Sequence, residues 1–382
     1  MKICFVSQQI GEIHTGVGTY ANALIPGLVR AGHEAVVVGR GRAPGWDGVE
    51  YRAVSPAPRD PTPEGWLSFA WRAAGMLGGA EGSDLVHFLD AREALFLPRL
   101  DGTPAVGTIH DCYLADASPS PLYWRRRYGD WRTRWVYHRL ARRLERRALR
   151  KLDFVIANSR WVERAVTAAY RLPAETASTV YLGFSWPAAP RADARPAAEV
   201  LFVGGNFQRK GLPTLLCALV LVAERVPDVR LRVIGDHPAR REMAALADRL
   251  GVGGRVEFLG GVPHETVVGH YRTARVLALP SEIEGFGIVL LEALHAGVPV
   301  IASARGGSAE LVRDGWNGYL VAPGDVRALA DRLVALLTDD ELQGRLGARG
   351  RETAGEFTLE RMTEETLAVY RAVLSRGKRG RP

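Results

Sequence analysis

One stretch decides the fold of the second half of the chain: Pro280-Ser281-Glu282-Ile283-Glu284-Gly285-Phe286-Gly287-Ile288-Val289-Leu290-Leu291-Glu292-Ala293-Leu294-His295. The apolar run before it ends at Leu279 and predicts a buried strand. Residues 284–287 then predict a glycine loop that enters a helix, which Gly297 and Pro299 end. A strand, a loop and a helix form the repeating unit of a doubly wound parallel sheet, and the loop lies at the carboxyl end of its strand, where such sheets bind ligands.

Two acids mark this stretch: Glu284 lies just before the N-terminus of the predicted helix, and Glu292 lies eight residues further on, within the helix. Their separation corresponds to roughly 12 Å along a helix axis and about 80° around it. Acids so placed do not readily share a proton or a metal, but they can bind two hydroxyl-bearing parts of one long ligand, with an anion at the helix N-terminus between them. The alternative is that both are ordinary helix acids. The glycines on either side of Phe286 favour a backbone that approaches a ligand closely.

The Glu284-x7-Glu292 pattern resembles the signature of retaining glycosyltransferases, and its surroundings are similar to glycosyltransferase family 4. The similarity continues through residues 305–325, from Arg305-Gly306-Gly307-Ser308-Ala309-Glu310 to Asp325, and covers most of the chain. The resemblance implies the GT-B fold: an α/β protein with two Rossmann-like domains facing each other across a cleft, and a C-terminal helix that crosses back to the first domain. It also implies transfer of a hexose-type sugar from a UDP- or GDP-sugar to a hydroxyl acceptor, with retained anomeric configuration.

Alternating apolar runs and helical patterns predict one parallel sheet in each half of the chain. We expect an N-terminal Rossmann-like acceptor-binding domain over residues 1–183 and a Pro/Ala-rich linker over 184–199. A C-terminal nucleotide-sugar-binding domain follows over 200–356, and residues 357–382 form the returning helix and a basic tail.

A second glycine loop, Gly204-Gly205-Asn206-Phe207-Gln208-Arg209-Lys210-Gly211, follows the first strand of the second half. Its glycines allow the backbone to approach a phosphate, and Arg209 and Lys210 can neutralise a leaving diphosphate. Members of the family commonly carry an Arg where this chain has Gly205, so we expect Arg209 to supply that charge. The alternative is a pair of solvated basic residues at a helix start.

The resemblance implies catalytic roles for Glu284, Lys210 and His110, the last at the end of a predicted strand near the reacting sugar. We predict donor contacts from a larger set of residues in both halves: Gly16, Gly18, Gly205, Arg209, Lys210, Gly285, Phe286, Gly287, Ile288, Val289 and Glu292. The resemblance implies that Glu284 holds hexose hydroxyls and that Glu292 holds the ribose.

A competing function is that of an NAD(P)-dependent oxidoreductase, because Gly16-Val17-Gly18-Thr19-Tyr20-Ala21 matches G-x-G-x-x-A and Arg40 could accept a 2′-phosphate. However, eight residues separate Ser7 from Gly16, whereas the dinucleotide fingerprint turns directly from strand into helix. A longer glycine loop suits contacts with donor phosphates or the acceptor better.

The three cysteines are scattered, no Cys/His cluster has zinc spacing, and no Asp-x-Asp pair is present to hold a metal under a diphosphate. We therefore expect a cytoplasmic protein without a metal or other cofactor, with the nucleotide sugar as co-substrate. The N-terminus does not have the pattern of a signal peptide.

The net charge of +8 comes from one segment, residues 124–151, which carries eleven Arg and one Lys against Asp130 and Glu145. In it Trp124, Tyr128, Trp131 and Trp135 recur at helical spacing, and Leu140, Leu144 and Ala148 continue an apolar stripe. This pattern is typical of a helix at the inner face of an anionic membrane, and a peripheral membrane-binding protein is a further alternative. The other interpretation is a helix that packs its aromatics on the first domain. No recognised nucleic-acid module accompanies the segment, so we expect no nucleic-acid partner.

Overall fold

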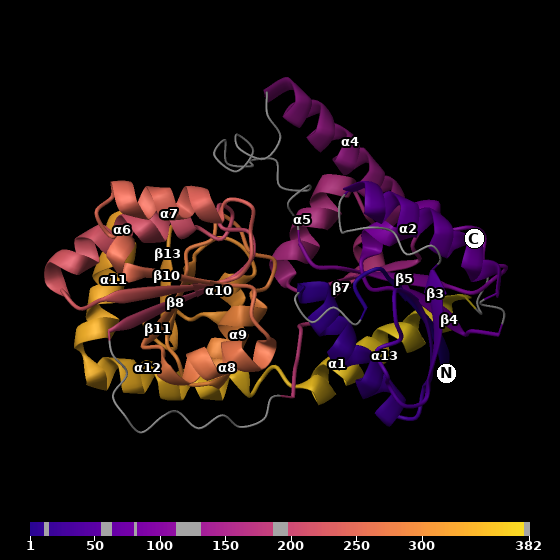
Figure 1. Ribbon diagram of the computed structural model, residues 1–382. Coiled ribbons are helices and arrows are strands. Elements are labelled where there is room, and N and C mark those ends of the chain that lie inside the picture. The colour runs from indigo at the N-terminus through magenta and orange to yellow at the C-terminus, as the bar shows by residue number, and fades with distance from the viewer. Residues whose placement is uncertain (11–14, 55–62, 80–81, 112–130, 186–197, 378–382) are drawn as a thin grey trace. The chain divides into compact units, whose positions relative to one another are not determined.

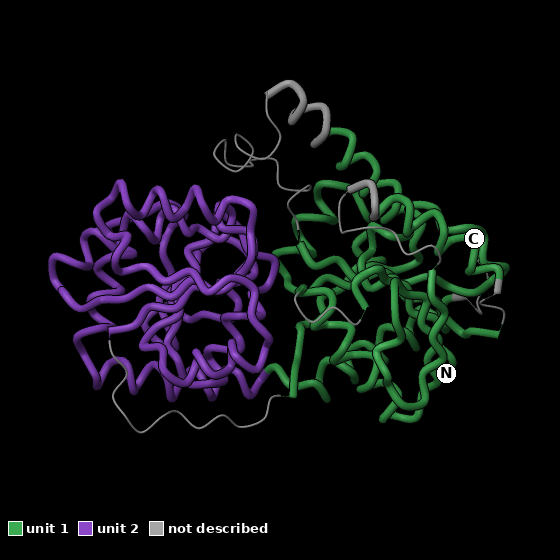
Figure 2. The backbone as a smooth tube through the Cα atoms, in the orientation of Figure 1, with its two compact units in different colours: residues 1–119, 127–185, 357–382 green, residues 120–126, 186–356 purple. Residues whose placement is uncertain are grey.

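The computed structural model describes residues 1–10, 15–54, 63–79, 82–111, 131–185 and 198–377. These residues form two compact units (Figure 2). Unit 1 holds the described residues up to Ser185 and those from Phe357 onward, and unit 2 holds those from Ala198 to Glu356. Each unit is built on its own parallel sheet.

Sheet 1, in unit 1, has seven parallel strands in the order β3-β2-β1-β4-β5-β6-β7 (Figure 1). The strands are β1 (Lys2–Ser7), β2 (Glu34–Arg40), β3 (Val49–Val54), β4 (Leu85–Phe88), β5 (Ala105–Ile109), β6 (Phe154–Ala157) and β7 (Ala177–Thr179). The helices of unit 1 are α1 (Gly16–Arg30), α2 (Pro63–Met76), α4 (Trp131–Leu149), α5 (Arg160–Tyr170) and α13 (Leu359–Gly377), and η2 (Ala91–Phe96) is a 3-10 helix. The chain order reverses between β1 and β4, which makes their carboxyl ends the switch point where ligands bind in such sheets.

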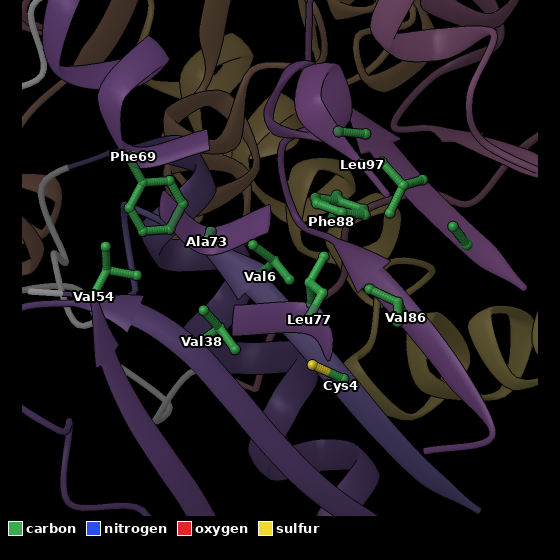
Figure 3. Packing of buried hydrophobic residues seen from close by; sticks show 12 residues of the cluster. Cys4, Val6, Val38, Val54, Phe69, Ala73, Leu77, Val86, Phe88 and Leu97 are labelled. Carbon is green, nitrogen blue, oxygen red and sulfur yellow. The ribbon is translucent and has the colours of Figure 1, made fainter. Parts of the chain in front are cut away.

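Both faces of sheet 1 are covered. Alternate residues of a strand point to opposite faces, so burial of consecutive residues shows packing on both sides. Cys4 and Val6 pack with Phe69 and Ala73 of α2 in one buried cluster (Figure 3). Phe5, which points to the other face, is equally buried and its ring lies 5.8 Å from that of His87. This two-sided burial explains the continuous apolar run of β1 from Ile3 to Val6.

The C-terminal helix α13 packs on the first unit, against α1 (Figure 1). The hydroxyl of Tyr370 lies 2.6 Å from Nδ1 of His87, whose Nε2 lies 2.8 Å from Oγ1 of Thr108. A Cβ on Gly27 would come within 2.9 Å of Thr363 Oγ1, so a glycine is needed where the two helices meet. The last helix is thus part of the core of unit 1.

Sheet 2, in unit 2, has six parallel strands in the order β10-β9-β8-β11-β12-β13. The strands are β8 (Glu199–Val203), β9 (Arg230–Ile234), β10 (Val256–Gly260), β11 (Val276–Leu279), β12 (Val300–Ser303) and β13 (Gly318–Val321). The helices are α6 (Leu212–Arg225), α7 (Arg240–Arg249), α8 (His264–Thr273), α9 (Ile288–His295), α10 (Ser308–Leu311), α11 (Val326–Thr338) and α12 (Asp340–Ala354). The order reverses between β8 and β11, so the two glycine loops that follow these strands lie at the switch point of this sheet.

The expected fold class is confirmed: an α/β chain with two Rossmann-like parallel sheets, whose last helix returns to the first unit. Three strands that the sequence pattern did not predict, β3, β7 and β13, all lie at sheet edges. β3 and β7 are partly exposed and lack the continuous apolar run that marks central strands, whereas β13 is a mostly buried run of four residues. Glu199, placed in the linker by the sequence, is instead the buried first residue of β8.

Candidate functional site

The two glycine loops of unit 2 meet through side chains that lie 74 residues apart in the sequence. Lys210 Nζ donates to Glu284 Oε2 at 3.1 Å, and Arg209 Nη1 lies 3.5 Å from the same oxygen. Arg209 Nη1 also donates to the carbonyl of Ile283 at 3.1 Å, and Ser281 Oγ donates to Glu284 Oε2 at 3.3 Å. Two cations therefore converge on one carboxylate, which leaves the group with a net positive charge.

Close approaches of other atoms explain Gly204 in the first of these loops and Gly306 in the loop after β12. A Cβ on Gly204 would lie 2.1 Å from Cδ of Lys210, so the absence of a side chain allows Lys210 to cross the loop toward Glu284. Gly306, with φ +105°, would place a Cβ 2.2 Å from the carbonyl oxygen of Glu284. That carbonyl accepts a hydrogen bond from the amide of Gly307 at 2.8 Å. The backbone of Glu284 is thus fixed by a loop that only glycine can form.

The protonation states of this group follow from burial and from the ion pairs. Burial by itself raises the pKa of Glu284, but Lys210 and Arg209 outweigh it, and the pKa lies below its usual value. Burial, with the like charge of Arg209, lowers the pKa of Lys210, while Glu284 opposes that shift. The alternative of solvated basic residues is wrong, because the side chains of Arg209 and Lys210 are only 13% and 14% exposed.

Glu292 is held by two residues of α8 that the sequence analysis missed. Its Oε2 accepts a hydrogen bond from the hydroxyl of Tyr271 at 2.7 Å, and its Oε1 lies 3.2 Å from Nε2 of His264. The hydrogen bond to Glu292 raises the pKa of His264. The two residues lie seven apart on α8, a spacing that places them on one helix face and could have identified them.

The loop before α9 places backbone amides at the switch point of sheet 2. Gly287 is the N-cap of α9, has φ +102° and makes no side-chain cap. The first amides of a helix have no acceptor within the helix, so those of Ile288 and Val289 suit an anion. Phe286 is 1% exposed, so its side chain belongs to the core, and only its backbone could contact a donor. Gly205 is exposed, with its backbone open to a ligand.

In unit 1 the N-terminus of α1 and His110 lie close together. The ring of Tyr20, in the second turn of α1, makes an edge contact with the ring of His110 at 5.0 Å. Gly16 is exposed, but the amide of Gly18 donates to Oγ1 of the N-cap Thr15 at 2.9 Å. The amide of Gly18 is therefore already used within the helix cap, and the donor contact expected of this residue stays a prediction.

His110 follows β5, as predicted, and is fixed from two sides. Its Nε2 lies 2.8 Å from the carbonyl oxygen of Leu89, and its own carbonyl accepts from Asn158 Nδ2 at 2.9 Å. Since a carbonyl only accepts, Nε2 carries the proton and Nδ1 keeps its lone pair. Burial lowers the pKa of His110, which keeps the ring neutral. Nδ1 has no hydrogen-bond partner among the described residues.

A buried ion cluster beside His110 was also missed. Arg92 pairs with Asp90 and with Asp111, each at 2.9 Å, and its Nε lies 3.9 Å from Oε1 of Glu145 in α4. The hydroxyl of Tyr170 donates to the other oxygen of Glu145. Burial raises the pKa of Glu145 to about 7. In the sequence Glu145 stands out only as one acid of a basic helix, and its position opposite the exposed arginines was the available signal.

The basic segment is described only in part. Trp124 and Tyr128 lie outside the described residues, and the helix α4 begins at Trp131. The expected apolar stripe is not evenly buried along the described part of α4: Leu140 is 53% exposed, whereas Ala148 is fully buried. The exposed residues there are mainly basic: Arg139, Arg143, Arg147, Arg150 and Lys151.

Neither a metal cluster nor a membrane span is found in the part of the chain that the structure describes. No three or more His, Cys, Asp or Glu side chains gather there in a way that could hold a metal ion. Likewise, none of the helices within those ranges has the length and apolar character needed to cross a membrane.

Two family models match the chain and together cover most of it. Residues 14–185 match the family described as Glycosyltransferase Family 4, and residues 192–353 match the family described as Glycosyl transferases group 1. Among solved structures, the sucrose-phosphate synthase of Thermosynechococcus elongatus is similar over 98% of this chain and 99% of its own, with a TM-score of 0.80 and 25% identity. The Anabaena protein HepE, in complex with UDP and glucose, has a TM-score of 0.74 and 22% identity over 97% of this chain and 99% of its own.

Curated relatives match over part of their length. The D-inositol 3-phosphate glycosyltransferase of Corynebacterium urealyticum is 35% identical over 185 residues, 46% of this chain and 44% of the relative. The phosphatidyl-myo-inositol mannosyltransferase of Mycobacterium leprae is 38% identical over 189 residues, 48% of this chain and 49% of the relative. The chain thus spans about half the length of the curated relatives it matches.

Proposed function

Because the chain belongs to glycosyltransferase family 4, we propose that it transfers a hexose-type sugar from a UDP- or GDP-sugar to a hydroxyl acceptor, with retained anomeric configuration. The observation that carries the proposal is the convergence of Lys210 and Arg209 on Glu284 at the switch point of sheet 2. This is where a doubly wound sheet binds a nucleotide.

In this proposal the two cations stabilise the leaving group. When the donor binds, its diphosphate joins Glu284 as a partner of Arg209 and Lys210, and the amides at the start of α9 add hydrogen bonds. Negative charge grows on the diphosphate as the glycosidic bond breaks, so contacts that strengthen with that charge lower the barrier. These groups supply the charge that a metal would otherwise supply, and we propose that the reaction needs no metal or other cofactor.

The two acids bind the rest of the donor. Glu284, fixed by its backbone and by three side chains, accepts hydrogen bonds from hexose hydroxyls beside the diphosphate. Glu292 accepts from the ribose with its remaining lone pairs, while Tyr271 and His264 orient it. On unit 1, the free lone pair of His110 Nδ1 accepts from a hydroxyl of the reacting sugar.

Retention follows if the acceptor attacks from the face that the leaving group vacates. The acceptor oxygen forms the new bond to the anomeric carbon, the bond to the diphosphate breaks, and the acceptor proton passes to a phosphate oxygen. No side chain needs to act as a nucleophile in this scheme.

The names of related proteins support candidate substrates. HepE is described with UDP and glucose, and a mannosyltransferase of Mycolicibacterium smegmatis is described as GDP-mannose-dependent. UDP- and GDP-hexoses are therefore the donors to test first, with inositol, its phosphates and other polyols as acceptors.

A second proposal concerns the place of action. The described part of α4 and the turn after it expose five cations, and Leu140 lies exposed among them. Each Lys or Arg near an anionic surface contributes about 1 kcal/mol. We propose a cytoplasmic enzyme that binds the inner face of the membrane reversibly through this segment; the free thiols of Cys4 and Cys217 are consistent with a reducing compartment.

The direct test of the proposed reaction is incubation with UDP- and GDP-hexoses and a panel of acceptors, with product analysis by NMR. The expected product from an α-linked donor carries an α-linkage, and a chelator leaves the rate unchanged. A β-linked product would contradict retention, and loss of the rate with chelator would contradict metal independence.

A further inference from the structure

The carboxyl edge of sheet 1 holds several buried polar atoms without a hydrogen-bond partner among the described residues. They are Oε1 of Gln8, Oε2 of Glu93, Oδ1 of Asn158 and Nδ1 of His110. Buried polar groups are almost always hydrogen-bonded, so each exception needs an explanation. Nδ1 of His110 is the atom that we propose to contact the reacting sugar, and the other three atoms, on the same edge of the same sheet, point to one further ligand.

Topology brings these residues together. Gln8 follows β1, Glu93 lies in the 3-10 helix after β4, His110 follows β5 and Asn158 follows β6. The four strands are consecutive neighbours in sheet 1, with a spacing of about 4.8 Å. The residues therefore line the carboxyl edge from its switch point outward.

Gln8 and Glu93 form the centre of this group. The backbone amide of Gln8 donates to Glu93 Oε1 at 3.0 Å, which fixes one oxygen and leaves Oε2 unpaired. Gln8 is 5% exposed and Glu93 is 1% exposed, so bulk water does not satisfy them. A buried amide oxygen and a buried carboxyl oxygen left without partners each cost stability, which natural proteins accept mainly at functional sites.

Asn158 is oriented by a contact of its own. Its Nδ2 donates to the carbonyl of His110, so the unpaired Oδ1 is the acceptor end of the amide. The side chain is 3% exposed. A ligand hydroxyl that donates to Oδ1 would satisfy this unpaired acceptor of Asn158.

The charges at this edge disfavour an anionic ligand. Asp90, Asp111 and Glu145 surround Arg92, whose guanidinium is engaged by the first two and faces the third. Burial, together with the charge of Asp90, raises the pKa of the nearby Glu93 well above its usual value, so this carboxyl is neutral and Asp90 and Asp111 supply the negative charge of the edge. Among the described residues of this edge, a phosphate or carboxylate would meet acids and acceptor atoms, and Arg92 is already paired.

We propose that the carboxyl edge of sheet 1 binds the acceptor substrate, and that this acceptor is a hydroxyl-rich molecule without negative charge, held by Gln8, Glu93 and Asn158. The inference rests on the proposed function, since it names the acceptor class of that reaction. Hydroxyl groups fit because each one both donates and accepts, so a polyol can pair with amide oxygens and with a carboxyl in either protonation state.

Ordered water is the competing explanation, and matched variants separate the two. Gln8→Met keeps the length of the side chain and the backbone bond to Glu93 but removes the unpaired amide. Gln343→Met is the matched control in unit 2, where an equally buried Gln donates to the carbonyl of Arg275 at 3.3 Å. Gln8→Glu restores an acceptor oxygen at the tested position.

The experiment titrates intact wild type and each variant with unmodified hexoses and cyclitols and with the monophosphate of each, followed by ligand-observed NMR. We expect unmodified compounds to bind better than their phosphates, and Gln8→Met to weaken that binding at least about tenfold, since one lost hydrogen bond in a buried site is of this size. Gln8→Glu should recover part of the affinity that Gln8→Met loses. Melting temperature should fall for Gln343→Met but not for Gln8→Met.

Four results would overturn the inference: no binding of any unmodified compound, tighter binding of the phosphates, unchanged binding in Gln8→Met, or equal loss in Gln343→Met. UDP and GDP binding, measured separately by calorimetry, tests the proposed function. Nucleotide binding without polyol binding refutes only the acceptor inference, and absence of nucleotide binding refutes the proposed function.

Discussion

Lys210 and Glu284 form a buried ion pair with a nitrogen–oxygen distance of 3.1 Å, and each residue stands in a different glycine loop of unit 2. Arg209 is the second cation on the same carboxylate oxygen. Without a donor, Glu284 is thus the counter-ion of the residues that we propose to bind the diphosphate. The arrangement makes separate predictions for stability, for binding and for transfer.

Replacing Glu284 by Ala should abolish transfer and lower stability, while UDP or GDP still binds. Two buried cations lose their partner, which should lower the free energy of unfolding by about 3 kcal/mol. Added nucleotide diphosphate supplies a new partner and should recover much of the loss in melting temperature. Glu341→Ala, at a 91% exposed acid of the same unit, is the control and should change neither property. Wild-type turnover in Glu284→Ala would remove Glu284 from the site.

The network of His87 makes a prediction about pH. Burial lowers the pKa of His87 from 6.5 to about 3, so between these values the unfolded chain binds a proton that the folded chain does not. The stabilising contribution is complete above about pH 6.5, and it is lost progressively as the pH falls toward about 3. Urea unfolding at a series of pH values should therefore show a smaller acid slope in His87→Asn than in wild type. Equal slopes would show that His87 does not titrate in this way.

Tyr370→Phe tests how much the contact between Tyr370 and His87 stabilises the packing of α13 in unit 1. The change removes the hydroxyl 2.6 Å from His87 Nδ1 and leaves that buried nitrogen unpaired, at a cost of about 1 to 2 kcal/mol. Tyr319→Phe is a suitable control, because the ring of Tyr319 packs against Arg332 at 4.3 Å and its hydroxyl makes no hydrogen bond to the described residues. Chemical denaturation of both variants measures the difference, and a neutral Tyr370→Phe would contradict the assignment.

The membrane proposal predicts co-sedimentation with anionic vesicles at low salt and release as salt screens the charges. Arg139, Arg143 and Arg147 replaced together by Glu should prevent it. The same change at Arg249, Arg327 and Arg345, exposed residues of unit 2, should have little effect. Wild-type protein that remains in the supernatant at low salt would show that the segment is an ordinary solvated helix.

The sequence predicted central features of the fold because they depend on local patterns. Apolar runs identified the central strands, and glycine loops after β8 and β11 identified the switch point of sheet 2. Edge strands such as β3 were missed, since partial exposure gives them a mixed composition.

At the site, the sequence pattern marked Glu284, Lys210 and His110, but it did not reveal their partners. Their spacing places Tyr271 and His264 on one face of α8, but the packing of α8 beside α9 was needed to show that this face meets Glu292. Gln8 and Glu93 stand 85 residues apart, and no local signal connects them. Phe286 shows the reverse case, because its motif suggests a ligand contact while its ring fills the core.

The most direct test of the central claim is a calorimetric titration of wild type and of Arg209→Ala/Lys210→Ala with UDP, GDP and the corresponding nucleosides. We predict that wild type binds at least one of the two diphosphates, and that the double variant loses at least about a hundredfold in that affinity, as expected for two charge-assisted contacts. Its affinity for the nucleoside should change little, because the nucleoside presents no phosphate to pair. Failure of wild type to bind either diphosphate, or an equal loss for nucleoside and diphosphate in the double variant, would contradict the account.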